Sequence, residues 1–196
     1  MIDYIKGEIA ELSPTSVTLE CSGIGYMAHI TLNTYSSLHG EGIAKLYIYE
    51  SIREDAHVLF GFFDKHERDI FLHLISVSGV GPGTARVILS SMNSKEIESV
   101  IASENVAVLQ TVKGIGAKTA QRIIVDLKDK IRYTESGNTV KVPAAMFVSG
   151  IGQEAVSALV MLGFTQANSQ KIVSKIVKES PSMPVEAIIK EALKRM

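Results

Sequence analysis

The sequence predicts a multidomain α+β protein: an N-terminal five-stranded OB-fold β-barrel, a helical domain with two helix-hairpin-helix motifs, a flexible linker and a C-terminal three-helix, UBA-like bundle. Three observations carry this prediction. Apolar residues alternate with a period of two up to about Phe63, and from Asp64 onward they recur with the period of a helix. A segment that contains Gly-aliphatic-Gly also occurs twice, 35 residues apart.

Residues 1–64 carry the strand pattern. Turn residues such as Gly23 and Gly40 separate short alternating stretches, of which the clearest are Val17-Leu19-Cys21, Leu46-Ile48 and Val58-Phe60. The spacing predicts five strands, with one short helix near residues 34–38. So few connecting residues indicate a small closed antiparallel barrel of the OB kind, with an SH3-like barrel as the alternative.

Residues 65–133 carry the helical pattern. Helix starts are marked by a D-x-x-E capping pair at Asp64 and Glu67, by Pro82 in a first turn, and by Asn93 with Glu96. We therefore expect five short helices, the first after Asp64, the others over 82–92, after Asn93, over 104–111 and over 117–131.

Residues 134–152 are rich in Gly, Ser, Thr, Asn and Pro and lack periodicity, which predicts the flexible linker. Residues 153–196 then predict three amphipathic helices, over 154–162, 165–178 and 184–195. A bundle of this size binds many kinds of partner, and on the sequence alone a stabilising appendage is the alternative.

Charge is unevenly distributed along the 196 residues, although the net charge is only -1. Residues 1–64 hold 3 Lys+Arg against 9 Asp+Glu, whereas residues 65–133 hold 10 against 7. The basic excess thus begins with the glycine repeat, as expected for a nucleic-acid interface. No apolar run suits a signal peptide or a membrane span, and the single Cys21 predicts a small buried core residue in a reducing compartment, so we expect a cytoplasmic protein.

The repeat aligns residues 74–89 with residues 109–124, and each copy places a Gly-aliphatic-Gly turn before a helix. We expect both glycines to permit positive φ and close approach of a phosphate, while Val80 and Ile115 anchor the turns in the core. Backbone N–H groups at each helix start, around residues 80–83 and 115–118, would bind phosphates, and such contacts carry no base sequence. The predicted DNA-binding residues are Gly79, Val80, Gly81, Gly83, Thr84, Arg86, Gly114, Ile115, Gly116, Lys118, Thr119 and Arg122.

Two other uses of glycine-rich turns compete with this interpretation. A dinucleotide-binding or other small-ligand protein would use such a turn in a βαβ unit, but both approaches have helical periodicity and no acidic residue follows at the expected distance. A P-loop fails because the Gly-Lys pair is missing, so we expect a non-enzymatic protein. The five histidines lack metal-ligand spacing, and we expect neither metal nor cofactor.

The order of these segments resembles the RuvA family, the DNA-binding subunits of bacterial Holliday-junction branch-migration complexes. The resemblance covers the whole chain and is carried by residues 23–26, 53–56, 59–62, 78–82, 114–119 with Arg122, and 154–159. It implies a homotetramer that holds four-way junction DNA open in recombination, DNA repair and the SOS response to DNA damage. Whether one or two tetramers bind a junction stays open. Gly83 and Ala117 depart from the family where lysine is frequent.

The resemblance also implies roles for two further groups of residues. Glu54 and Asp55 would form an acidic pin at the centre of the tetramer, although a solvated acidic turn is the simpler interpretation of the sequence alone. The C-terminal bundle would bind the hexameric ATPase RuvB, and the resolvase RuvC is a further partner to consider. Candidate partner-binding residues, each of which also suits a core, are Leu159, Met161, Leu162, Phe164 and Ile189.

Overall fold

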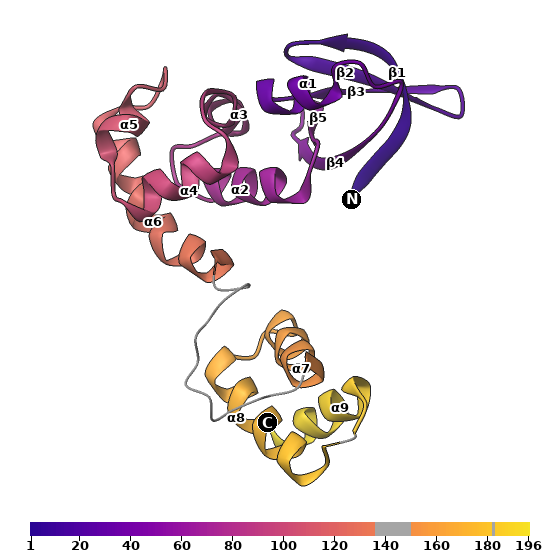
Figure 1. The fold of residues 1–196 in the computed structure, drawn as a ribbon, viewed down its shortest axis with the longest axis vertical. Helices are drawn as coiled ribbons and strands as arrows, with labels where there is room; N and C mark the ends of the chain where they lie inside the picture. Colours follow the sequence, from indigo (N-terminus) through magenta and orange to yellow (C-terminus); the bar gives the residue numbers. More distant parts are fainter. Residues whose placement is uncertain (136–149, 182) are drawn as a thin grey trace. The chain divides into compact units, whose positions relative to one another are not determined.

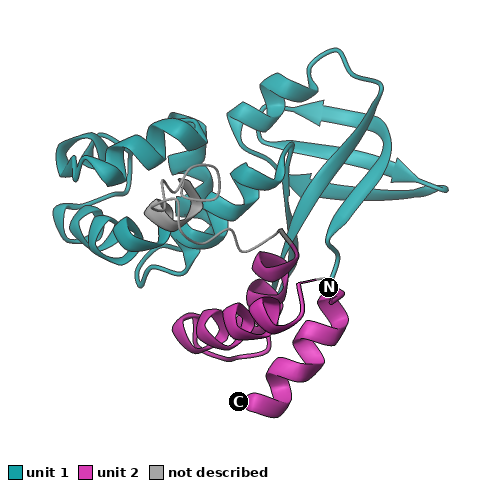
Figure 2. Ribbon diagram, turned by 60° about the horizontal axis from the view of Figure 1, so that its bottom comes forward, with its two compact units in different colours: residues 1–139 teal, residues 140–196 magenta. Residues whose placement is uncertain are grey.

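A computed structural model describes residues 1–135, 150–181 and 183–196 of the chain. The fold divides into two compact units, residues 1–139 and 140–196 (Figures 1 and 2). The first unit contains the strands and the helices as far as α6, and the second contains three helices. The two units are described separately.

The N-terminal strands close into a barrel in the order β1-β2-β3-β5-β4. The five strands are β1 (Tyr4–Ser13), β2 (Ser16–Cys21), β3 (Ile24–His29), β4 (Ile43–Ile52) and β5 (His57–Phe62). Helix α1 (Leu32–Leu38) joins β3 to β4, as the short interruption predicted. The expectation of a wholly antiparallel barrel is wrong at one seam, because β3 and β5 pair in parallel, with Ala28 opposite Leu59.

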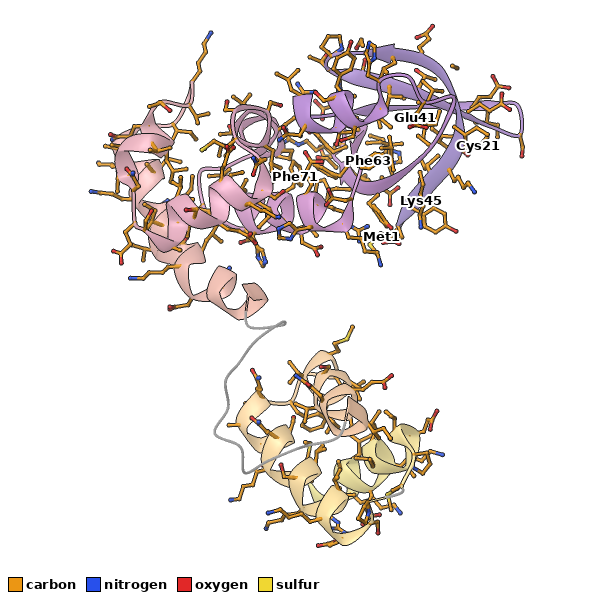
Figure 3. All side chains as sticks on the ribbon, in the orientation of Figure 1. Met1, Cys21, Glu41, Lys45, Phe63 and Phe71 are labelled. Carbon is orange, nitrogen blue, oxygen red and sulfur yellow. The ribbon has the colours of Figure 1, made fainter. Side chains whose placement is uncertain are left out.

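Alternating side chains fill the barrel, as the period of two requires. The interior side chains are Ile5, Val17, Leu19, Ala28, Ile30, Leu38, Ala44, Leu46 and Ile48. Cys21 is only half-buried, contrary to prediction, since it ends β2 at the edge of this core (Figure 3). Its Sγ donates a hydrogen bond to the Lys6 carbonyl at 3.1 Å.

Gly7→Ala is expected to destabilise the barrel strongly. A Cβ at Gly7 would lie 2.3 Å from the Glu20 carbonyl oxygen and 2.6 Å from the Cys21 Sγ, so the strand pair must separate. Overpacking of this kind costs about 1–3 kcal/mol or more. Thermal unfolding followed by circular dichroism measures the loss. Gly42→Ala is the control, since a Cβ there meets no atom within 4 Å, and equal melting temperatures for the two variants would contradict the prediction.

Five helices follow the barrel in the first unit. They are α2 (Lys65–Ile75), α3 (Pro82–Ser91), α4 (Ser94–Ala102), α5 (Val106–Gln110) and α6 (Ala117–Glu135). The predicted starts of α2, α3, α4 and α6 are confirmed, and Asn93 with Glu96 forms a full capping box. Helix α5 begins two residues later than expected, because Glu104 adopts a left-handed φ of 55° and Asn105 becomes the N-cap.

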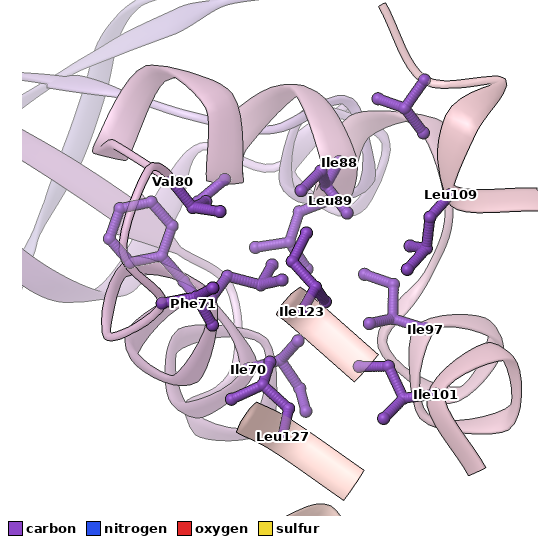
Figure 4. Close-up of a cluster of buried hydrophobic side chains, with 14 of the residues drawn as sticks. Ile70, Phe71, Val80, Ile88, Leu89, Ile97, Ile101, Leu109, Ile123 and Leu127 are labelled. Atoms are coloured by element: carbon purple, nitrogen blue, oxygen red, sulfur yellow. The ribbon is translucent and has the colours of Figure 1, made fainter. Parts of the chain in front are cut away.

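The helices pack around a core of buried apolar side chains (Figure 4). This core continues into the barrel. Phe60 and Phe62 of β5 belong to this core, and both rings lie against Phe71 of α2, at centroid distances of 5.5 and 4.8 Å. Apolar burial of this kind contributes about 25 cal/mol per Å². Barrel and helices therefore form one compact body in which the relative placement of strands and hairpins is fixed.

The second unit contains α7 (Gly150–Met161), α8 (Gln166–Glu179) and α9 (Val185–Arg195), which confirms the three predicted helices. Its core is formed by Ala155, Leu159, Val173, Ile176, Ile188 and Ala192. Helix α6 extends to Glu135 and α7 begins at Gly150, so both ends of the predicted linker are helical. The rest of that prediction, residues 136–149, lies outside the described residues.

Candidate nucleic-acid interface

The two glycine hairpins have the same backbone structure, and corresponding atoms lie 35 residues apart. The Val80 N–H donates to the Val77 carbonyl at 3.0 Å, and the Ile115 N–H donates to Val112 at 3.1 Å. One turn later the Ala85 N–H donates to the Gly81 carbonyl, as its counterpart Ala120 does to Gly116, both at 2.9 Å. The sequence repeat is therefore a structural repeat.

The two glycines of each hairpin have different roles. Gly79 and Gly114 adopt left-handed φ values of 94° and 93°, which side chains disfavour. Gly81 is instead the N-cap of α3, with an ordinary extended φ of -88°, so the expected positive φ is wrong there. A Cβ at Gly81, Gly83 or Gly116 would meet no atom within 4 Å. Glycine at these positions leaves the helix start open to an approaching group.

The central residues of the hairpins serve the fold. Val80 and Ile115 are each 5% exposed and belong to the helical core, as predicted for anchors. Their N–H groups are occupied within the turns, so the expectation that these two amides face a phosphate is wrong. The free donors of a helix start are those of its first turn, which lack intrahelical acceptors. In the hairpins these are the N–H groups of Gly83 and Thr84 in α3 and of Ala117, Lys118 and Thr119 in α6.

Positively charged side chains surround both hairpins. Lys118 and Arg122 are exposed on α6, and Arg86 is half-buried on α3. The Arg122 guanidinium donates to the Ser78 carbonyl at 3.1 Å, so it links the second repeat to the first hairpin. Lys113 is also exposed, directly before Gly114. It was not among the predicted DNA-binding residues, and the repeat aligns it with the uncharged Ser78. The charges and the helix dipoles favour anions at the same place.

Lys118→Ala is expected to reduce the salt dependence of DNA binding. Each phosphate neutralised by a cation contributes about 0.9 to the slope of log affinity against log salt, so the slope should fall by about 0.9 for each chain that contacts DNA. Fluorescence anisotropy between low and physiological salt measures it. Lys95→Ala removes an exposed lysine from the start of α4 and serves as the control. Equal slopes for the two variants would place Lys118 outside the interface.

An acidic turn lies close to the first hairpin. Glu54 and Asp55 are exposed in the turn between β4 and β5, which the Arg53 N–H closes by donating to the Ala56 carbonyl at 2.8 Å. Asp55 lines the same shallow hollow as Pro82 and Gly83. A DNA backbone at this hairpin would therefore approach the acidic side chains.

The predicted partner-binding residues fall into two groups. Met161 and Leu162, at the end of α7, are 88% and 60% exposed. Phe164 and Ile189 are half-buried against the core of the second unit, and Leu159 is fully buried within it. Leu159 therefore cannot contact a partner while the bundle is folded. Val160, beside Met161, is also exposed and was not among the predicted residues.

The structure does not support the competing interpretation of the glycine turns. Helix α2 precedes the first hairpin and α5 precedes the second, so neither turn belongs to a βαβ unit. Within residues 1–135, 150–181 and 183–196, no three His, Cys, Asp or Glu side chains are grouped to hold a metal ion. None of the helices in the described part of the chain is long and apolar enough to cross a membrane.

Comparisons with known proteins agree with this arrangement of parts. Residues 1–61 match the RuvA N terminal domain, residues 71–129 the SAM-like helix-hairpin-helix tandem, and residues 151–196 the RuvA C-terminal domain. The chain is 56% identical to a protein of Bacteroides thetaiotaomicron and 58% identical to one of Parabacteroides distasonis, with 100% of each chain covered. A protein of Cytophaga hutchinsonii is 46% identical over 99% of both chains. All three are described as Holliday junction branch migration complex subunit RuvA. Similarity over the full length and in every domain means that this chain belongs to the RuvA family.

Proposed function

We propose that this chain binds four-way (Holliday) junction DNA without reading its base sequence and presents it to the ATPase RuvB for branch migration in recombination and DNA repair. The repeated hairpin supports this proposal most directly. Each copy offers first-turn amides, an open glycine surface and nearby cations, which suit phosphates and not base edges. The relatives named above are subunits of such a complex.

We infer that the chain acts as a homotetramer. One chain provides two backbone grips, enough for one duplex, and a four-way junction has four duplex arms. In a tetramer the four acidic turns would converge where the arms meet, and Glu54 and Asp55 would repel phosphates there and favour strand separation. Light scattering with and without junction DNA distinguishes one tetramer from two on a junction.

The chain itself supplies binding and no catalysis in this proposal. RuvB would hydrolyse ATP. The complex would act on chromosomal junctions in the cytoplasm, where the resolvase RuvC could also reach the DNA. The C-terminal bundle would hold the motor. Met161 and Leu162 are the best contact residues, because burying a side chain of this kind stabilises a complex by about 1.5–3 kcal/mol.

Met161→Ser combined with Leu162→Ser is expected to weaken RuvB binding at least about tenfold, since both apolar side chains lose their buried area. Junction affinity should not change, because the hairpins lie in the other unit. Surface plasmon resonance with immobilised RuvB measures the first quantity and anisotropy the second. Ile151→Ser, an exposed apolar residue in the first turn of α7, is the control. Undiminished RuvB binding by the double variant would move the contact elsewhere.

A gel-shift titration tests the proposal. A synthetic immobile junction is compared with a linear duplex of equal total length over a series of salt concentrations. We expect the junction to bind more tightly than the duplex, and both affinities to fall steeply with salt. Equal affinity for the two DNAs would contradict junction recognition, and salt-independent binding would contradict backbone contacts.

A further inference from the structure

The connection between the acidic turn and the first hairpin is short and rigidly held. Strand β5, which follows the acidic turn, ends at Phe62, and α2, which leads to the hairpin, begins at Lys65. Only Phe63 and Asp64 lie between them. We call these two residues the joint. A change in its backbone would move the hairpins relative to Glu54 and Asp55.

A buried carboxylate lies at the joint. Glu67, in the first turn of α2, is 4% exposed, and it does not return to the N-cap as a capping pair would. Its two carboxylate oxygens instead accept hydrogen bonds from the hydroxyls of Thr31 and Thr34, at 2.5 and 2.6 Å. Both threonines are fully buried. The prediction from sequence identified the Asp64 cap but missed this use of Glu67.

A connected set of hydrogen bonds holds the Glu67 carboxyl. The Thr34 hydroxyl accepts from the Phe63 N–H, and the Thr31 hydroxyl accepts from the Thr34 N–H, each at 3.0 Å. Each hydroxyl thus accepts one N–H and donates its own proton to a Glu67 oxygen, so that both carboxyl oxygens act as acceptors. Two bonds of this kind suit an ionised carboxylate. Asp64 completes the set by accepting from the Glu67 N–H at 2.8 Å.

Helix α1, which begins beside Thr31, also holds the far side of the first hairpin. The Asn33 amide donates to the Leu89 and Met92 carbonyls at 2.6 and 3.3 Å, where α3 ends. The Leu32 N–H donates to the Ser90 hydroxyl at 3.2 Å. Through Glu67 and Asn33, the barrel thus fixes both helices that flank the hairpin.

Stability alone does not explain a carboxyl buried at this place. Burial raises the pKa of the Glu67 carboxyl, and the hydroxyls of Thr31 and Thr34 only partly offset it. A raised pKa means that ionised Glu67 opposes folding: its stabilising contribution is complete below the ordinary value of 4.5 and is lost as pH rises through the folded value. A buried carboxyl whose ionisation opposes folding suits a role in fixing geometry.

We infer that Glu67 is a positioning residue for junction recognition: it locks the joint, and so holds the paired hairpins at a fixed distance from the acidic turn. This inference rests on the proposed function. A linear duplex needs only the hairpins, whereas a junction needs hairpins and acidic turn in one arrangement. Loss of the lock should therefore affect junctions and spare duplexes.

The test compares junction and duplex affinities of Glu67→Gln with those of the unaltered protein, by anisotropy at one salt concentration. The amide cannot accept from both threonines, so one buried hydroxyl loses its acceptor. We expect duplex affinity to stay within about twofold and the preference for the junction to fall about tenfold. Glu98→Gln is the matched control: it neutralises another buried carboxylate, which pairs with His66 at 3.3 Å and takes no part in the bonds to Thr31 and Thr34, and it should keep the full preference.

The same joint can be tested from the barrel side. Thr34→Val removes one donor with little change in shape and should lower the preference as Glu67→Gln does, whereas Thr34→Ser keeps the hydroxyl and should restore it. The double variant should lose little more than either single one, because the two residues act together. Retained preference in Glu67→Gln, or equal losses for both DNAs, would overturn the inference alone. Equal affinity of the unaltered protein for both DNAs would overturn the proposed function as well.

Discussion

Valine in place of both Gly81 and Gly116 is expected to reduce DNA affinity at least about a hundredfold while the protein stays folded. Neither residue has a left-handed φ, and a Cβ at either position meets no atom within 4 Å, so the fold tolerates the side chains. The added atoms would fill the space through which a phosphate reaches the first-turn amides. Each lost hydrogen bond to a charged group costs about 1.5–3 kcal/mol, and both hairpins lose them.

Two measurements keep this prediction specific. Thermal unfolding of the double variant should match that of the unaltered protein within a few degrees, and anisotropy with a linear duplex gives the affinity. Gly42→Val, which also extends into open space but lies in the barrel, should bind normally. Normal DNA binding by the Gly81 and Gly116 variant would remove the hairpins from the interface.

Neutralising the acidic turn should have the opposite effect on binding. Glu54→Gln with Asp55→Asn is expected to tighten junction binding about tenfold and to change the rate of branch migration with RuvB. Repulsion between two charges 4 Å apart is worth about 1 kcal/mol in water, and in a tetramer four turns would contribute together. Gel shift gives the affinity, and strand exchange on a mobile junction gives the rate.

The control for this variant removes the same amount of charge elsewhere. Glu8 and Glu20 are exposed and pair across β1 and β2, so Glu8→Gln with Glu20→Gln lowers the negative charge of the barrel equally. We expect this control to change junction affinity less than the variant of the turn. Weaker junction binding after neutralisation of Glu54 and Asp55 would refute repulsion at the crossover.

Local patterns were sufficient to predict most of the fold. Alternation located the strands because one face of each is buried, and the caps at Asp64 and Asn93 located helix starts because they satisfy local amides. The parallel pairing of β3 with β5 was not predictable in this way. It joins residues 28 and 59, and alternation within a strand says nothing about which strand lies beside it.

The candidate site was predicted in its elements but not in its detail. The repeat located both hairpins, because each copy has glycine at the left-handed residue and at the open helix start. It could not distinguish the amides that the turns use from those that stay available, since this depends on hydrogen bonds such as that of Val80. Glu67 was missed for a similar reason: its partners, Thr31 and Thr34, lie more than 30 residues away.

Competition for a labelled immobile junction tests the central claim most directly, that repeated backbone grips recognise the shape of DNA and not its sequence. The competitors are an unlabelled junction with unrelated arm sequences and a linear duplex with the sequence of the labelled arms. We predict that the unrelated junction competes as well as the labelled one and that the matching duplex competes poorly, because phosphate contacts carry no base sequence. Better competition by the matching duplex than by the unrelated junction would contradict this account.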